Sequence, residues 1–160
     1  MATDVKLTED MKRVVREQRL GFVATVCRDG TPNLSPKGTV AVWDDDHLFF
    51  ADIRSPNTVR NLRANPAVEV NVVDPIARRG YRFKGRGEVV TDGPLFERIM
   101  ASAEGQVTRA RERVRAFVLV TVERAHPLTS PAYDLGLSER QVRERWERHY
   151  DGLRSVPGDR

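Results

Sequence analysis

Short apolar and β-branched runs, separated by polar turns, dominate the first half of the chain. Leu20 to Cys27 is the first of these runs and predicts a strand. Arg28-Asp29-Gly30 follows it as a turn, because Asp-Gly is a strong hairpin signal. Three more strands are predicted close behind, at Pro32 to Lys37, Thr39 to Trp43 and His47 to Asp52. This spacing indicates a series of antiparallel hairpins.

The second half continues the strand pattern and adds helical segments. Ala67 to Val73, Gly80 to Thr91 and Ala116 to Val122 predict strands. Helices are predicted after a capping Thr8, from Ser55-Pro56 to Asn65-Pro66, from Pro94 through Met100, and from Ser138 to about Tyr150. Gly105 is expected to break the third helix, with a further helical piece to Arg113.

Six or seven short strands with tight links predict a mainly β protein with peripheral helices, whose antiparallel sheet closes on itself. The helices do not alternate with the strands, which argues against a doubly wound parallel sheet. No Gly-x-Gly-x-x-Gly follows a strand. We expect one domain over residues 1–160, in which residues 125–160 form a C-terminal loop and helix extension.

Composition narrows the setting in which the protein works. The 160 residues are 39% hydrophobic and 31% charged, which is ordinary for a globular protein. No apolar run approaches the roughly 18 residues of a membrane span, and the polar segment Met1 to Glu9 lacks a signal core. The single cysteine, Cys27, fits a reducing compartment. We therefore expect a cytoplasmic protein without a membrane partner.

The net charge of +4 raises the question of nucleic-acid binding. The basic runs at 109–115 and 140–148 are interleaved with glutamates, which is typical of solvated helix faces. We therefore expect no nucleic-acid partner. A site for a phosphate-bearing small molecule would use the same positive charge.

Neither a metal site nor a nucleophile is evident. His47, His126 and His149 are far apart in the chain, and none has a second histidine or a cysteine at ligand spacing. No Gly-x-Ser-x-Gly elbow is present. We expect no metal and assign no catalytic acid or base.

The segment from Asn33 to Thr58 holds the strongest candidate site. A helix predicted to begin at Ser55-Pro56 presents unpaired N–H groups and a partial positive charge, which suit a phosphate. Arg54 stands just before this helix, and Lys37 can add a second cation from the preceding hairpin. The alternative is an ordinary capped helix with a surface arginine and lysine. Physical reasoning alone leaves both open.

The order and spacing of several short motifs resemble a known family. The motifs are Gly21-Phe22-Val23-Ala24-Thr25-Val26, Asp29-Gly30 with Pro32, Ser35-Pro36-Lys37-Gly38, Phe49-Phe50-Ala51-Asp52 with Ser55, and Leu62 with Asn65-Pro66. Together they resemble the FMN-binding split barrels related to pyridoxamine 5′-phosphate oxidase. The resemblance runs from Leu20 to Thr91, with the order of elements agreeing to about Glu123. It implies a six- to seven-stranded antiparallel split β-barrel.

The resemblance also implies a cofactor site. Lys37 would reach the flavin, and the strand end at Ala51 and Asp52 would pass beside the ring and ribityl chain. The family's phosphate-binding Ser-Arg-Lys corresponds here to Ser55, Pro56 and Asn57, so Arg54 would replace the lost cations. The implied cofactor-binding residues are Asn33, Ser35, Pro36, Lys37, Gly38, Ala51, Asp52, Arg54, Ser55, Asn57, Thr58 and, from a dimer partner, Arg82.

The resemblance implies an FMN-dependent oxidoreductase that acts on an unidentified small molecule. It also implies a homodimer with the flavin at the interface. The tail from Trp146 to Tyr150 lacks the Arg-x-His element with which the oxidase grips its substrate, so we do not expect pyridoxamine phosphate. Two alternatives remain open. One is a deazaflavin-dependent reductase of the same fold, and the other is a non-catalytic flavin or haem-binding module with His126 or His149 as axial ligand.

Overall fold

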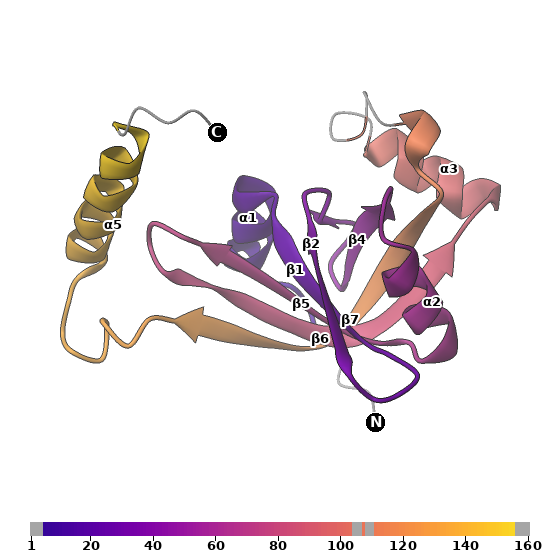
Figure 1. Ribbon diagram of the computed structural model, residues 1–160, viewed down its shortest axis with the longest axis horizontal. Helices are drawn as coiled ribbons and strands as arrows, with labels where there is room; N and C mark the ends of the chain where they lie inside the picture. Colours follow the sequence, from indigo (N-terminus) through magenta and orange to yellow (C-terminus); the bar gives the residue numbers. More distant parts are fainter. Residues whose placement is uncertain (1–4, 104–106, 108–110, 156–160) are drawn as a thin grey trace.

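Seven strands form one antiparallel sheet in the order β2-β1-β5-β6-β7-β4-β3. The computed structural model describes residues 5–103, 107 and 111–155. Its strands are β1 (Gly21–Val26), β2 (Pro32–Lys37), β3 (Ala41–Val42), β4 (His47–Asp52), β5 (Ala67–Asp74), β6 (Arg79–Val90) and β7 (Ala116–Thr129). The sheet curls into a half-barrel (Figure 1). This confirms the predicted mainly β class and the antiparallel split barrel.

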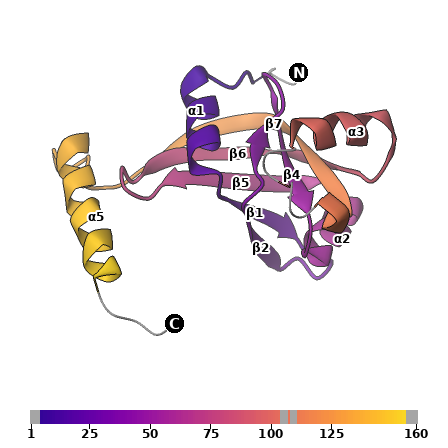
Figure 2. The same cartoon turned by 90° about the horizontal axis from the view of Figure 1, so that it is seen from above.

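The helices lie at the periphery of this sheet (Figure 2). The described residues contain α1 (Glu9–Gln18), α2 (Pro56–Ala64), α3 (Gly93–Ser102), a 3₁₀ turn η1 (Arg111–Arg113) and α5 (Glu139–Arg154). Thr8 caps α1 as predicted, with its hydroxyl accepting the Met11 N–H at 3.2 Å. The predicted break at Gly105 lies outside the described residues. No helix among the residues that the structure describes is long and apolar enough to cross a membrane.

Strands β4 and β7 are covered on both faces, which explains their continuous apolar sequence. Leu48 and Phe50 of β4 point into the larger hydrophobic cluster inside the curl of the sheet, together with Val118 and Val120 of β7. The alternate positions, which include Phe49, join a second cluster with α3 on the opposite face. Because side chains alternate between the faces of a strand, a strand buried on both faces needs no polar positions. This packing fixes the end of β4, where the candidate site begins.

Two predicted strands have different bounds. The strand expected over Thr39 to Trp43 shrinks to Ala41–Val42, because Gly38 and Thr39 form a turn in which the Thr39 hydroxyl accepts the Ala51 N–H at 2.9 Å. The strand expected to end at Val122 instead continues to Thr129, within the region predicted to be a loop. Beyond Thr121 this strand pairs with β6 and no longer with β4. Pro127 is tolerated there, because a strand with one unpaired edge does not need every backbone N–H for the sheet.

Candidate functional site

Lys37 is the best-anchored polar residue of the candidate site. It ends β2 and is only 5% exposed. Its ammonium donates to the hydroxyls of Ser35 and Ser55, both at 2.5 Å. An ammonium has three N–H donors, so one remains available to a ligand. Lys37 therefore links the end of β2 to the start of α2.

Burial lowers the pKa of Lys37 from its ordinary value of 10.5, and the nearby carboxylate of Asp52 partly opposes this effect. Asp52 is itself buried at the end of β4, and its Oδ1 accepts the Ser55 N–H at 2.9 Å. The balance between the buried cation and the buried carboxylate makes the charge of Lys37 sensitive to an anion placed beside it.

The N-terminus of α2 is left without a side-chain cap. Ser55 occupies the capping position, but its hydroxyl makes no hydrogen bond to the first turn and instead accepts the Lys37 ammonium. Pro56 has no N–H, so the first free donors belong to Asn57 and Thr58. A helix start of this kind suits an anion, since its N–H groups and its dipole are both unsatisfied.

A cavity of about 200 Å³ unites these features. It lies where the end of β2 and its following turn meet the end of β4 and the start of α2. Its lining consists of Pro36, Lys37, Gly38, Thr39, Ala51, Ile53, Arg54 and Ser55. Arg54 is exposed beside the buried Lys37, so the cavity offers one guanidinium and one ammonium. We call it the β2–α2 cavity.

A buried hydrogen-bond network holds α2 against the first hairpin. The Asn33 amide donates to the hydroxyls of Thr25 and Thr58 at 3.2 and 3.4 Å. The Asn61 amide donates to the same Thr25 hydroxyl at 3.1 Å. Because Thr25, Thr58 and Asn61 are all buried, this network fixes the position of the helix start relative to β1 and β2.

The structure therefore brings most of the predicted site residues together. Ser35, Lys37 and Ser55 form one hydrogen-bonded group, and Asn33 and Thr58 belong to a second group centred on Thr25. Pro36, Gly38, Ala51 and Arg54 line the β2–α2 cavity. Asp52 accepts the N–H of the lining residue Ser55, and Asn57 is exposed at the helix start.

Arg82 is the exception among the predicted residues. It lies on β6, where its Nε is 2.8 Å from the carboxylate of Glu69, which also pairs with Lys84 at 3.2 Å. Within one chain it does not reach the β2–α2 cavity.

Sequence reasoning missed three contributors to the site, namely Thr25, Thr39 and Asn61. Thr39 lines the cavity and bonds the end of β4. Thr25 and Asn61 are buried polar residues. Asn61 shares the buried side of α2 with Thr58 and Leu62, and a polar residue at such a position signals a specific hydrogen bond.

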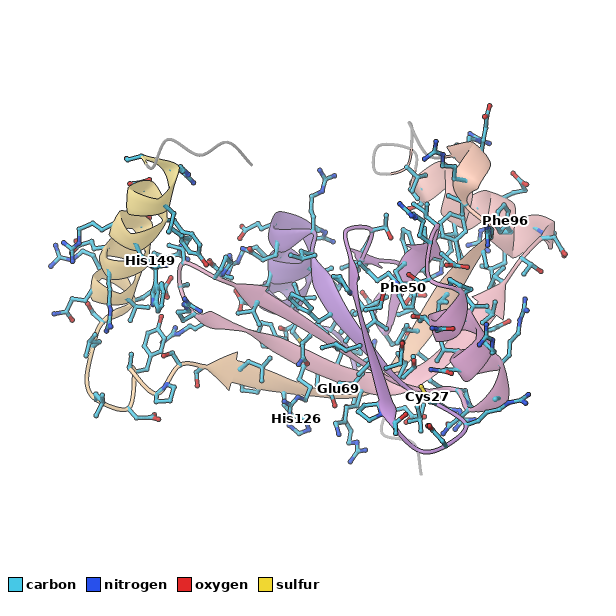
Figure 3. The ribbon with its side chains drawn as sticks, in the orientation of Figure 1. Cys27, Phe50, Glu69, Phe96, His126 and His149 are labelled. Atoms are coloured by element: carbon cyan, nitrogen blue, oxygen red, sulfur yellow. The ribbon has the colours of Figure 1, made fainter. Side chains whose placement is uncertain are left out.

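The histidines do not join this site. His126 lies on β7 and His149 on α5, well separated in Figure 3. The His47 ring lies 2.8 and 2.7 Å from the carboxylates of Asp44 and Asp46. The same Asp44 oxygen accepts the backbone N–H groups of Asp46 and His47. This cluster is accounted for as a turn, and we assign no metal to it.

One face of the sheet beside the cavity is apolar and open. Phe22 on β1 is 42% exposed and Leu34 on β2 is 65% exposed. The registers of the strands place both on the same face as Glu69 and Arg82, because Leu34 pairs with Ala24, which in turn pairs with Glu69. We call this surface the β1–β2 face. It adjoins the β2–α2 cavity through Pro36.

Comparison with known proteins agrees with this geometry. Residues 7–132 match the pyridoxamine 5′-phosphate oxidase family. The uncharacterised protein MJ0282 of Methanocaldococcus jannaschii is 31% identical over 95 residues. That alignment covers 58% of this chain and 62% of MJ0282, so the chain spans about three fifths of this relative.

Solved structures extend the match. HupZ of Group A Streptococcus is 31% identical with a TM-score of 0.68, covering 78% of this chain and 95% of HupZ. An F420 reductase is 28% identical with a TM-score of 0.58, and the match covers 75% of this chain and 98% of the reductase. An FMN-binding protein of Syntrophomonas wolfei shares the fold at 16% identity and a TM-score of 0.65, and the match covers 76% of this chain and 86% of that protein. The chain belongs to the pyridoxamine 5′-phosphate oxidase family, with the fold of its flavin-binding members.

Proposed function

We propose that the chain is an FMN-dependent oxidoreductase that binds its flavin at the β2–α2 cavity and acts on a small molecule. The observation that carries the proposal is Lys37, buried and held by two serines beside the uncapped start of α2. A buried lysine next to free helix N–H groups favours the binding of an anion, because the anion compensates the buried charge and accepts hydrogen bonds from the helix.

The residues present fit a flavin phosphate and ring. Arg54 and the N–H groups of Asn57 and Thr58 would hold the phosphate, since charge-assisted hydrogen bonds to phosphate are strong. Lys37 has a free N–H donor and would supply positive charge beside the ring. Gly38 has no side chain and Ala51 a small one, which leaves room in the cavity for a planar group. A bound flavin supplies the redox chemistry, and the chain supplies binding, orientation and charge.

We also propose that two copies assemble through the β1–β2 face. An exposed apolar surface that includes Phe22 and Leu34 is typical of an interaction site. The face adjoins the cavity, so a second copy would cover a ligand that one chain leaves open. Arg82 lies on this face and would approach the partner's site. The cytoplasm remains the proposed location, in keeping with the free thiol of Cys27.

The test begins with the absorption spectrum of the purified protein. Oxidised flavin bands support the proposal, and a Soret band would favour a haem-binding module instead. Titration of the apo-protein with FMN and with a deazaflavin separates the leading cofactor from its alternative, which is supported by the similarity to an F420 reductase.

Arg54→Ala then tests the site itself. We expect this change to weaken FMN binding by about 1.5–3 kcal/mol, the usual scale for a hydrogen bond to a charged group. Arg16→Ala, an exposed arginine on α1, is the matched control and should leave the dissociation constant unchanged. If Arg54→Ala and Lys37→Ala both retain FMN as tightly as the wild type, the assignment of the site is wrong.

A further inference from the structure

Helix α5 meets the rest of the chain along one narrow face, at the tip of the hairpin between β5 and β6 (Figure 1, Figure 2). Glu139, Val142, Arg143 and Trp146 share this face, because residues three, four and seven positions apart lie on one side of a helix. Val142 is buried. The guanidinium of Arg78, at the hairpin tip, lies 3.3 Å from the centre of the Trp146 ring. Only one purely apolar side chain therefore contributes to this docking face.

The hairpin presents opposite charges to the charged residues of the docking face. The Arg79 guanidinium lies 3.3 Å from the Glu139 carboxylate. The Arg143 guanidinium lies 3.0 Å from the Asp74 carboxylate. The side chains of Glu139 and Arg143 are 45% and 38% exposed, so both pairs are open to dissolved ions. The docking of α5 therefore depends largely on electrostatic attraction near the protein surface.

The second half of α5 adds nothing to this docking. In the part of the chain that the structure describes, the polar contacts of residues 147–154 stay within the helix, as does the 3.2 Å pair of Arg154 with Asp151. Leu153 is 55% exposed. The helix has 16 residues, close to the length at which isolated helices are only marginally stable in water. Release of its first half from the hairpin should therefore unfold the whole helix.

The docked helix also closes a cavity of about 270 Å³. Glu139 and Arg143, which pair with the hairpin, form its wall on the side of α5. The other walls come from α1, from the hairpin and from the end of β7, where the partly buried Leu128 belongs to the lining. We call it the α1–α5 cavity. Because its wall and the docking pairs use the same two residues, release of α5 would open it to solvent.

The rest of the cavity does not need α5 to hold its charges. On α1, Arg13 pairs with Asp10 at 2.6 Å and with Glu17 at 2.7 Å. On the hairpin, Asp74 also accepts two backbone N–H groups of the turn, at 2.8 and 2.9 Å. These contacts lie within single elements, so they survive when the helix leaves. The opening is therefore local and leaves the sheet folded.

We propose that α5 is an electrostatic strap, which closes the α1–α5 cavity when docked and is released by rising ionic strength while the sheet stays folded. This inference does not depend on the proposed flavin site. The screening length falls from about 30 Å at 0.01 M salt to about 3 Å at 1 M, which weakens exposed pairs far more than buried contacts. Elements with few buried apolar contacts open at free energies below that of global unfolding.

The experiment compares three proteins by amide hydrogen exchange at low and high KCl concentration. The test variant is Arg79→Gln with Arg143→Gln, which removes both guanidinium groups from the docking pairs. The matched control is Arg148→Gln with Arg154→Gln, which removes the same charge from exposed positions in the undocked half of the same helix. All three keep Trp146 and the apolar part of the docking face.

Amides of residues 143–150 report on α5, and amides of β4 and β7 report on the sheet. In the wild type and the control, we expect exchange in α5 to become about tenfold or more faster between about 0.01 and about 1 M KCl, because both docking pairs weaken. The test variant should exchange fast already at low salt and change by less than about threefold. Hydroxyl-radical labelling of Leu128 should rise together with exchange in α5.

Exchange in α5 of the wild type that does not respond to salt would overturn the inference. Identical behaviour of the test variant and the control would also contradict it. If the amides of α5 and of the sheet accelerate together, the salt acts on global unfolding and the strap is wrong. Faster exchange in α5 with unchanged labelling of Leu128 would mean that the helix does not close the cavity. If the sheet amides show that the test variant is unfolded, the salt series on the wild type and the control decides alone.

Discussion

At the scale of single residues, the buried Lys37 is the most informative member of the candidate site. A lysine at a strand end is ordinarily solvent-exposed, whereas this one is buried and donates to two serine hydroxyls. Burial of a charged amine without an anionic partner at hydrogen-bond distance costs free energy, which is why its pKa is lowered. A bound anion relieves part of this cost.

We expect the affinity for FMN to fall with rising pH at a lower pH than an ordinary lysine would dictate. Bound FMN is an anion and favours the charged form of Lys37 beside its ring, and the lowered pKa means that Lys37 loses this charge at a pH below 10.5. Titrations of the apo-protein at several alkaline pH values measure the fall. Lys37→Arg keeps its charge throughout, because the guanidinium pKa exceeds about 12, and should remove the fall. An identical pH profile in both proteins would contradict the role of Lys37.

The stability of the unliganded protein should change in the opposite direction. The unfolded chain holds the Lys37 proton more tightly than the folded chain, because the folded pKa is lowered. The free energy of unfolding therefore rises with pH between the lowered pKa and 10.5. Lys37→Met lacks this contribution, and denaturant titrations of both proteins across that range measure the difference.

Ser55 shows what local sequence rules can and cannot predict. Ser-Pro correctly marks the start of α2, but the hydroxyl does not cap the helix. It bonds Lys37, which lies 18 residues away in the chain. A capping rule considers only the next three residues, so it could not anticipate a competing partner on another strand.

At the scale of elements, periodicity predicted the helices and most of the strands. It failed where pairing with a neighbouring strand determines the bounds of a strand. The polar stretch at the end of β7 has no strand pattern, yet β6 offers it a long paired edge. Similarly, the predicted third strand is lost to a turn that Thr39 stabilises through Ala51. Both outcomes depend on which partner lies alongside, which one sequence does not reveal. The same limit hid a cavity whose lining includes Arg28, Arg60, Arg63 and Arg115, because these residues are distant in the chain.

Helix α5 is a separately anchored element. It begins at Glu139 with a capping box between Ser138 and Gln141, and it lies beyond the family match, which ends at residue 132. The Arg78 guanidinium stacks 3.3 Å from the centre of the Trp146 ring. Arg143 also pairs with Asp74 at 3.0 Å. These contacts tie the helix to the tip of the hairpin between β5 and β6, at the opposite end of the sheet from α2 (Figure 1).

We expect Trp146→Ala to loosen α5 without affecting flavin binding. The change removes a cation–π contact worth about 0.5–2 kcal/mol. Amide hydrogen exchange should become faster in α5 and remain unchanged in β4 and β7. Trp146→Phe retains an aromatic face and is the matched control. A loss of FMN affinity in Trp146→Ala would instead mean that α5 forms part of the site, as a lid or across the dimer.

At the scale of the whole molecule, the open β1–β2 face bears on whether the proposed flavin site needs a second copy of the chain. The face combines the exposed Phe22 and Leu34 with the ion pairs of Glu69, and the cavity opens beside it. A stable dimer usually buries about 800 Å² on each partner. The face spans three neighbouring strands, β2, β1 and β5.

We expect the protein to run as a dimer in analytical ultracentrifugation. Leu34→Asp should raise the dimer dissociation constant by about 100-fold or more, because it places a charge at the centre of an apolar contact. Leu135→Asp, at an exposed leucine in the turn before α5, is the matched control and should remain dimeric. A dimer that survives Leu34→Asp would place the interface elsewhere.

Arg82 connects the proposed dimer with the proposed flavin site, so the two proposals can be tested together. Within one chain its guanidinium is engaged by Glu69 and does not reach the β2–α2 cavity. We therefore expect any effect of Arg82→Gln on FMN affinity to act on the site of the partner chain. We expect a loss of about tenfold in the dimer and none in the Leu34→Asp background, where each chain binds alone. An equal loss in both backgrounds would mean that Arg82 acts within its own chain, through Glu69 and the sheet.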